Sequence, residues 1–420
     1  MPRVMLVLPS QTYRAKEFLD AATRLGIDVV SASDTAQAMA ASFPGRFLAL
    51  PLQDPKAAAR IVDRFARKTP IDAVVAVDDE SALAAAYAAE QLGIAKNPPS
   101  AIEATRDKSK MRRLLSTAGV SQPGFAVVEA SENEAENVVY VADLFGYPVV
   151  IKPNSLSASR GVERADNADD ARLAAARTRS VALSAGCAPD EPLLVERYVA
   201  GDEIALEGML TNGAMRTLAI FDKPEPLTGP YFEETIYVTP SRHDPELLGR
   251  VEEEIASACA AIGLVDGPLH AEARLAPSGA DPDATVVVLE AAARTIGGKC
   301  SKALRFASDR SLEELVLSHA LGIDETSLSR EAGASGVMMI PVPSSGRFDG
   351  VDGSDEALGI EHITELDITV PVGRTIAAWP QGDRYLGFLF ARADEPEQVE
   401  NALRQAHSHL SVRVSNEHET

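Results

Sequence analysis

The chain has 420 residues, of which 45% are hydrophobic and 24% are charged, and its formal net charge at pH 7 is -22. This length and composition predict a globular protein with two or three domains and ample core. The negative charge argues against a nucleic-acid surface, which needs clustered positive charge, but it leaves room for a nucleotide site with a few local cations.

The cysteines point to a reducing compartment. Cys187, Cys259 and Cys300 are far apart and match no metal-ligand spacing, which favours a cytoplasmic protein. No apolar run approaches the roughly 18 residues of a membrane span, so we expect no membrane association.

The first 97 residues alternate between strand-like and helical patterns. Strands are predicted at 3–9, 27–33 and 71–79, and helices at 13–26, 56–70 and 80–93. Such alternation predicts a doubly wound parallel α/β domain over residues 1–97. The segment lacks a G-x-G-x-x-G motif, which disfavours a dinucleotide site.

Two further regions follow the break at KNPPSA (96–101). A second domain is predicted over 98–334, and it contains a subdomain at 121–200 with a mobile loop. From residue 335 short strand-like runs are divided by Gly and Pro and closed by a helix at 395–410. We therefore predict a small α+β module over 335–420.

Glu272 and Glu290 are the most informative residues. They lie in PLHAEARL and VVVLEAAAR, two strand-like runs, and each is equally far from Asp281 in the connector. A hairpin would place the carboxylates opposite each other with Cβ atoms about 5 Å apart, where like charges repel. A divalent cation between them removes that repulsion, and Mg²⁺ prefers oxygen ligands. The alternative is two surface glutamates on an exposed hairpin.

Strand alternation predicts which side chains share the face of this pair. They are His270, Glu272, Arg274, Glu290 and Arg294, together with Val286 and Val288.

Lys152 ends a strand-like run and precedes a small, polar loop at 154–161 that closes at Gly161. Consecutive backbone N–H groups in such a loop form an anion nest, and the lysine adds a positive charge for phosphate. The alternative is a serine-rich mobile loop without a ligand.

The motif VERYVAGDE offers a second nucleotide contact. A strand that ends at Glu196–Val199 can present backbone donors and acceptors to a flat heterocycle, and Glu203 can reach ribose hydroxyls. The alternative is an ordinary strand–turn–strand.

These motifs together resemble the ATP-grasp superfamily over nearly the whole chain. Lys108 in RDKSKMR, Lys152 in VIKP, the 154–161 loop, VERYVAGDE and paired glutamates before R-x-x-G-G occur in the order of that superfamily. The strings HAEARL, VLEAAARTIGG and FDKPEPLTGPYFEETIYVTPSR look most like those of bacterial L-amino acid ligases, which form dipeptides. Many ATP-grasp enzymes have Asn where this chain has Ala292, and this departure leaves the number of metal ions open.

The resemblance implies an ATP-grasp fold and ATP-dependent ligation of a small-molecule carboxylate to an amine through an acylphosphate, with release of ADP. The residues it implies for ATP are Lys108, Lys152, Ser157, Ser159, Gly161, Glu196, Tyr198, Val199 and Glu203. Glu272 and Glu290 are expected to hold Mg²⁺, or Mn²⁺ in its place. Arg294, Gly297 and Gly298 are expected to serve the acylphosphate.

Other residue roles stay open. His270 can contact substrate, act as a base, or be a satisfied core histidine. Glu233 and Glu234 lie in a lid-like connector and can bind a substrate amino group or form a solvated acidic loop, and Arg274 is a further substrate candidate. A homodimer also stays open.

Two other functions remain as alternatives. One is a different ATP-grasp activity, either of the purine-biosynthetic or of the bicarbonate-activating type. The other is a non-catalytic nucleotide-binding regulator, against which the complete set of Lys, Glu and Arg residues argues.

Overall fold

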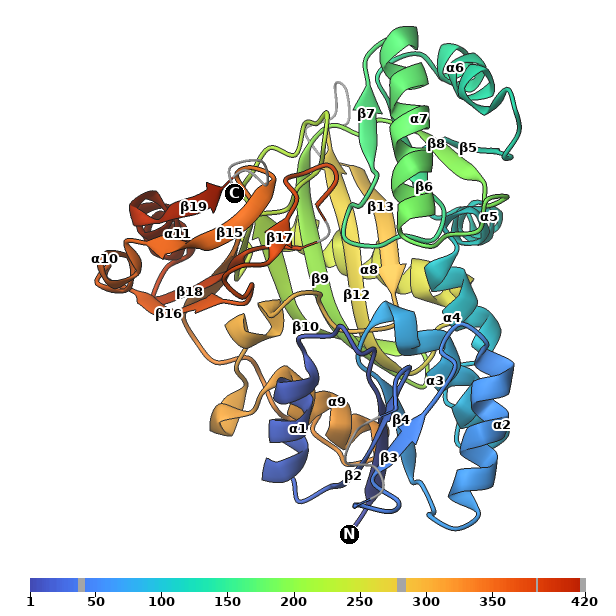
Figure 1. The fold of residues 1–420 in the computed structure, drawn as a ribbon, viewed down its shortest axis with the longest axis vertical. Helices are drawn as coiled ribbons and strands as arrows, with labels where there is room; N and C mark the ends of the chain where they lie inside the picture. Colours follow the sequence, from blue (N-terminus) through green and yellow to red (C-terminus); the bar gives the residue numbers. More distant parts are fainter. Residues whose placement is uncertain (37–41, 278–284, 383, 416–420) are drawn as a thin grey trace.

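The computed structural model describes residues 1–36, 42–277, 285–382 and 384–415 (Figure 1). The N-terminal domain has a parallel sheet in the order β3-β2-β1-β4. Its strands are β1 (Arg3–Val7), β2 (Asp28–Ser33), β3 (Phe47–Ala49) and β4 (Ala73–Ala76), and its helices are α1 (Ala15–Arg24), α2 (Pro55–Ala66) and α3 (Asp79–Gln91).

Both faces of this sheet are covered. Val4 and Leu6 of β1 belong to the same core cluster as Phe18 of α1, whereas Met5 and Val7 pack with residues of α2 and α3. A strand buried on both faces reads as a continuous apolar run, which is why the run at 3–9 predicted it. The predicted doubly wound domain is confirmed.

A small lobe projects from the top of the molecule (Figure 1). Two helices, α4 (Pro99–Arg106) and α5 (Lys108–Ala118), lead into it. Its antiparallel sheet has the order β5-β8-β6-β7. The elements are β5 (Phe125–Val128), α6 (Glu134–Phe145), β6 (Val149–Pro153), β7 (Glu163–Ala165), α7 (Ala168–Ser184) and β8 (Leu193–Arg197).

The largest sheet has eight strands in the order β13-β12-β9-β10-β11-β14-β18-β16. They are β9 (Asp202–Thr211), β10 (Ala214–Lys223), β11 (Ile236–Thr239), β12 (Gly267–Ala276), β13 (Thr285–Ala292), β14 (Ala334–Ile340), β16 (Ile363–Ile368) and β18 (Gly387–Ala393). Because β14 pairs with β11, this sheet runs through the predicted boundary at 334/335. The C-terminal strands therefore extend the central sheet.

The remaining elements cover this sheet or follow it. They are α8 (Pro245–Ile262), η1 (Cys300–Ala303), η2 (Ala307–Asp309), α9 (Leu312–Ala320), β15 (Gly346–Asp352), α10 (Ser354–Leu358), β17 (Thr375–Ile376), α11 (Pro396–His409) and β19 (Ser411–Ser415). β17, β15 and β19 form a separate three-stranded sheet. Among the described residues, no helix has the length and apolar character needed to cross a membrane.

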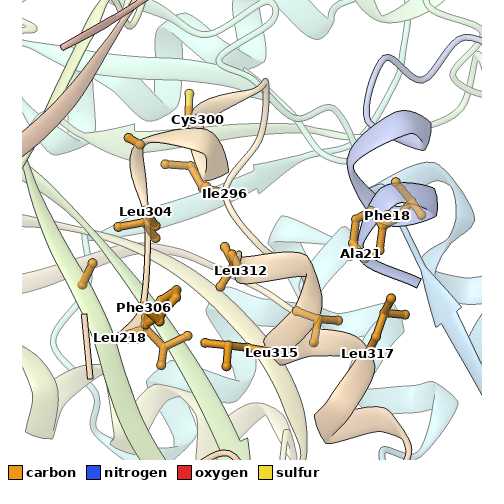
Figure 2. Packing of buried hydrophobic residues seen from close by; sticks show 14 of the residues in the cluster. Phe18, Ala21, Leu218, Ile296, Cys300, Leu304, Phe306, Leu312, Leu315 and Leu317 are labelled. Carbon is orange, nitrogen blue, oxygen red and sulfur yellow. The ribbon is translucent and has the colours of Figure 1, made fainter. Parts of the chain in front are cut away.

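One core cluster joins the N-terminal domain to the large sheet (Figure 2). Phe18 and Ala21 of α1 share this cluster with Leu315 of α9 and with Ile296 and Cys300. The packing holds the segment that follows β13 against the N-terminal domain, so residues from both can line one site.

Candidate active site

A cavity of about 330 Å³ lies where the N-terminal domain, the small lobe and the large sheet meet. The predicted site residues line it, with the exceptions of Gly161 and Glu233. Residues far apart in the sequence, such as Lys108 and Gly298, thus share one cavity.

The two glutamates are opposite each other, as predicted. β12 and β13 are antiparallel, and Glu272 is the direct register partner of Glu290. The middle of the connector, including Asp281, lies outside the described residues.

The placement of Val286 and Val288 on the same face is wrong. A register shift beyond the Glu272–Glu290 pair leaves Leu289 without a partner, and Val288 then pairs with Ala273 and Val286 with Leu275. A β-bulge of this kind reverses the alternation of side chains. Both valines pack instead in the core on the opposite side of the sheet.

The carboxylates are partly open to the cavity. Oε1 of Glu272 lies 3.1 Å from Nζ of Lys223 and 3.4 Å from Nε2 of His270, and Oε2 of Glu290 lies 3.5 Å from Nζ of Lys108. Burial alone would raise the pKa of Glu272, but Lys223 and His270 outweigh it and hold this pKa well below its ordinary value. Two facing carboxylates, at least one of them firmly ionised, form an oxygen donor set that fits Mg²⁺.

Lys223, at the end of β10, was missed by sequence analysis. Its buried Nζ lies 2.7 Å from Glu203, 2.5 Å from Glu234 and 3.1 Å from Glu272. Burial acts to lower the pKa of Lys223, but these carboxylates raise it well above its ordinary value. The signal in the sequence was the position of this lysine, two residues after the apolar run LAIF. A lysine at the end of a buried strand can itself be buried, and a buried lysine is rarely unpaired.

His270 is held between two carboxylates. Nδ1 lies 2.5 Å from Oε1 of Glu207, whose other oxygen accepts a hydrogen bond from the backbone N–H of Ile296. Burial lowers the pKa of His270, but Glu207 and Glu272 outweigh this and raise it to about 9. The imidazolium therefore links the metal-ligand candidate Glu272 to the start of the Gly297–Gly298 segment.

Lys152 and Arg112 share one buried carboxylate, that of Glu196. Glu196 accepts from Nζ of Lys152 at 2.6 Å and from Nε of Arg112 at 2.6 Å. Lys108 donates to the carbonyl of Leu156 at 2.6 Å, which ties this lysine to the 154–161 loop. Arg112 was also missed by sequence analysis.

The loop has a backbone suited to an anion. Ala158 and Ser159 adopt positive φ values of 56° and 51°, and Gly161 has a φ of 70°. Turns of this kind point successive N–H groups in one direction. Ser157 and Ser159 line the cavity, whereas the carbonyl of Gly161 accepts a hydrogen bond from Thr178.

We expect Glu196→Gln to lower the free energy of unfolding by about 3 kcal/mol, because it leaves buried Arg112 and Lys152 without their shared charge. Urea denaturation measures this. The matched control is Glu136→Gln, which breaks an exposed ion pair with Arg172 and should leave the free energy of unfolding almost unchanged. An equal loss in both variants would contradict the interpretation.

The wild type and the Glu196→Gln variant should become similar in stability at low pH. Burial would raise the pKa of Glu196, but Arg112 and Lys152 lower it to about 2. A depressed pKa stabilises the fold above the ordinary glutamate value, and this contribution is lost as the pH falls from about 4.5 towards 2. The stability difference between the wild type and Glu196→Gln should shrink over that range.

Arg274 lies two residues beyond Glu272 in β12 and holds several neighbouring groups in place. It donates to Glu203 at 3.0 Å, to the Tyr198 hydroxyl at 3.1 Å, to the Val199 carbonyl at 2.8 Å and to the Leu227 carbonyl at 2.6 Å. All three of its nitrogens are therefore engaged by the protein. This geometry makes Arg274 a support for Tyr198, Val199 and Glu203 and leaves it no free donor pair for a substrate carboxylate.

Arg294 reaches the N-terminal domain. Its Nε lies 2.7 Å from Oδ2 of Asp79, the first residue of α3, and its Nη1 donates to the Thr295 carbonyl at 3.0 Å. Asp78 lies 3.6 Å from Arg14, while Glu80 has no ion-pair or hydrogen-bond partner among the described residues. These carboxylates were missed, although they follow β4 at the edge where ligands bind in parallel sheets.

Three family profiles match successive parts of the chain. The ATP-grasp N-terminal domain matches residues 19–95, the ATP-grasp domain matches 145–303, and the L-amino acid ligase C-terminal domain 2 matches 338–415. The chain belongs to the ATP-grasp superfamily. The ATP-grasp fold predicted from the motifs is confirmed.

Two ligases are among the similar proteins. The crystal structure of the L-amino acid ligase from Bacillus licheniformis matches this ATP-grasp chain with a TM-score of 0.79, 26% identity and coverage of 99% of each chain. The alanine–anticapsin ligase of Bacillus subtilis (strain 168) is 28% identical over 206 residues, which cover 45% of this chain and 42% of that ligase. The chain thus spans less than half the length of this curated relative.

A more distant structure shares the fold alone. Phosphoribosylglycinamide synthetase from Anaerococcus prevotii matches with a TM-score of 0.68 at 14% identity, over 99% of this chain and 100% of that chain. The predicted resemblance to L-amino acid ligases in particular is confirmed by the C-terminal profile and the Bacillus licheniformis structure.

Proposed function

We propose that this protein is an ATP-dependent ligase that joins the carboxylate of an amino acid to the amine of a second substrate and releases ADP and phosphate. The observation that carries the proposal is that one cavity holds the facing pair Glu272 and Glu290, the lysines Lys108 and Lys152, and Arg294. A binding-only protein has no need of this combination.

The cavity divides into a nucleotide end and a reaction end. Tyr198, Val199 and Glu203 would contact adenosine, and the N–H groups of the 154–161 loop would contact phosphate, with Lys108 and Lys152 adding positive charge. Glu272 and Glu290 would hold Mg²⁺ or Mn²⁺ at the join between the two ends. The bound metal supplies positive charge that shields the phosphates from an approaching carboxylate.

The reaction has two displacements. A carboxylate oxygen of the first substrate attacks the γ-phosphorus of ATP, the bond to the bridging oxygen breaks, and ADP leaves. The amine of the second substrate then attacks the acyl carbon, and the carbon–oxygen bond to phosphate breaks. The amine loses a proton, and the phosphate leaves with one oxygen from the original carboxylate.

The protein groups around Arg294 can stabilise the negative charge that develops in these two displacements. Asp79 and the Thr295 carbonyl engage Nε and Nη1 of Arg294, and no described residue accepts from its Nη2, which can therefore bind an anion. The N–H groups of Gly297 and Gly298 can add to the same anion site, where preorganised donors stabilise developing charge. The Glu80 carboxylate, which has no partner among the described residues, can accept from a substrate ammonium, whereas Glu234 is already bound by Lys223 and Tyr237.

The test is an assay of ADP, phosphate and AMP with Mg-ATP and pairs of amino acids. We expect ADP and phosphate in equal amounts, with turnover that requires both a carboxylate and an amine. Formation of AMP and pyrophosphate, or ATP hydrolysis that is indifferent to amino acids, would contradict the proposal.

A further inference from the structure

The reaction end of the cavity has a wall of two tyrosines and a methionine, Tyr13, Tyr385 and Met339. Phe388 stands behind it, with its ring centroid 6.1 Å from that of Tyr13 and 6.5 Å from that of Tyr385. The wall adjoins the glycine pair, because a Cβ atom at Gly298 would lie 3.1 Å from the Phe388 ring. Apolar surface is thus placed directly beside the groups proposed to act on the acylphosphate.

Part of the wall is exposed to solvent and open to contact with a ligand. Tyr13 is 45% exposed although it lines the cavity. Neither the Tyr13 hydroxyl nor the Tyr385 hydroxyl makes a hydrogen bond to any described residue, so neither ring is oriented by a polar partner. Large aromatic side chains that face a cavity gain free energy when a ligand covers them.

Charges of both signs surround the wall. Arg14 and Arg294 act electrostatically on Tyr13, as does Asp78, and Glu234 and Glu233 act on Tyr385. The three wall residues themselves are uncharged. An apolar side chain packed against them has no charge to desolvate, whereas a charged one would lose hydration against their surface.

We infer that this wall binds the side chain of one amino-acid substrate, and that this side chain is large and apolar, of the size of phenylalanine, methionine or leucine. The inference rests on the proposed ligase function and adds the substrate class. The substrate would lie with its backbone groups towards Arg294 and Gly298 and its side chain towards the three wall residues.

The three wall residues come from distant parts of the chain. Tyr13 lies in the loop between β1 and α1, Met339 lies in β14, and Tyr385 lies just before β18. The N-terminal domain and the C-terminal strands therefore both contribute to substrate choice, whereas the small lobe contributes to nucleotide binding. Substitutions in the wall should change selectivity among amino acids without changing ATP affinity.

The test is a comparison of kcat/KM for amino-acid pairs. Pairs that contain phenylalanine, methionine or leucine should exceed pairs made only of glycine, aspartate or lysine by at least about 10-fold, since burying a large apolar side chain contributes one to two factors of ten to affinity. Tyr13→Ala should reduce that preference by about 10-fold through a higher KM for the large substrate. Tyr13→Phe should retain it, because the ring supplies the surface.

Two further variants complete the design. Tyr140→Ala removes a tyrosine that is 66% exposed on α6, outside the cavity lining, and should leave the preference unchanged. Tyr385→Ala should reduce the preference as Tyr13→Ala does, and the KM for ATP should stay within about 2-fold of the wild type in all of these variants.

The inference and the proposed function fail in different ways. Turnover that is fastest with small or charged amino acids only, or a Tyr13→Ala variant that slows all pairs equally, would overturn the inference and leave the ligase function standing. Absence of ADP release with every amino-acid pair would overturn the ligase function and the inference together.

Discussion

Replacement of Glu290 by glutamine is expected to lower turnover by at least about 1,000-fold, equivalent to roughly 4 kcal/mol of transition-state stabilisation. Glu290 faces Glu272 across the hairpin, and the nearest cation, Lys108, is 3.5 Å away. The amide keeps the size of the side chain but removes the charge that would bind a divalent ion. ADP release under saturating ATP and Mg²⁺ measures the effect.

Glu290 is a cleaner position for this test than Glu272. Glutamine at 272 would also disturb Lys223 and His270, which both contact that carboxylate. The matched control is Glu253→Gln at an exposed position on α8, which should retain full turnover. Near-normal activity of Glu290→Gln at ordinary Mg²⁺ concentration would show that this carboxylate is not a metal ligand.

Replacement of Arg294 by methionine is expected to lower kcat by about 100- to 1,000-fold, the range found when one preorganised donor to a developing anion is removed. ATP affinity should change much less, because Arg294 lies towards the N-terminal domain, where Nε meets Asp79. Arg294→Lys should still lose at least about 10-fold, since an ammonium cannot hold Asp79 and an anion in the two-pronged way of a guanidinium.

The variant Asp79→Asn distinguishes the effect of the orientation of Arg294 from the effect of its charge. It weakens the contact that fixes Arg294 but keeps the guanidinium, so we expect a smaller loss of kcat than in Arg294→Met. Calorimetry with an ATP analogue should accompany both variants. If Arg294→Met weakens nucleotide binding as much as it slows turnover, the residue is a nucleotide clamp and its proposed role at the acylphosphate is wrong.

Much of the fold could be predicted because local patterns determined it. The run at 3–9 is apolar on both faces because α1 and the α2–α3 pair cover both sides of β1. The opposition of Glu272 and Glu290 could also be predicted, because their symmetric spacing fixes the register of a hairpin. The bulge at Leu289 could not, because it depends on how β12 and β13 fit the sheet as a whole.

Other parts of the site depend on contacts between distant segments. Asp79 meets Arg294, which is 215 residues away, and no local pattern links the two. Lys223 is identified only when β9, β12 and the connector before β11 bring Glu203, Glu272 and Glu234 around it. Similarly, Tyr13 reads as part of the predicted helix at 13–26, yet it lies in the loop before α1 and lines the cavity.

Transfer of an oxygen isotope tests the central claim most directly. The carboxylate of the first amino acid is labelled with ¹⁸O, and the released phosphate is analysed by mass spectrometry after ligation in unlabelled water. An acylphosphate intermediate predicts one ¹⁸O atom in each phosphate formed, with ADP as the other product. Unlabelled phosphate, or label recovered in AMP, would contradict the account.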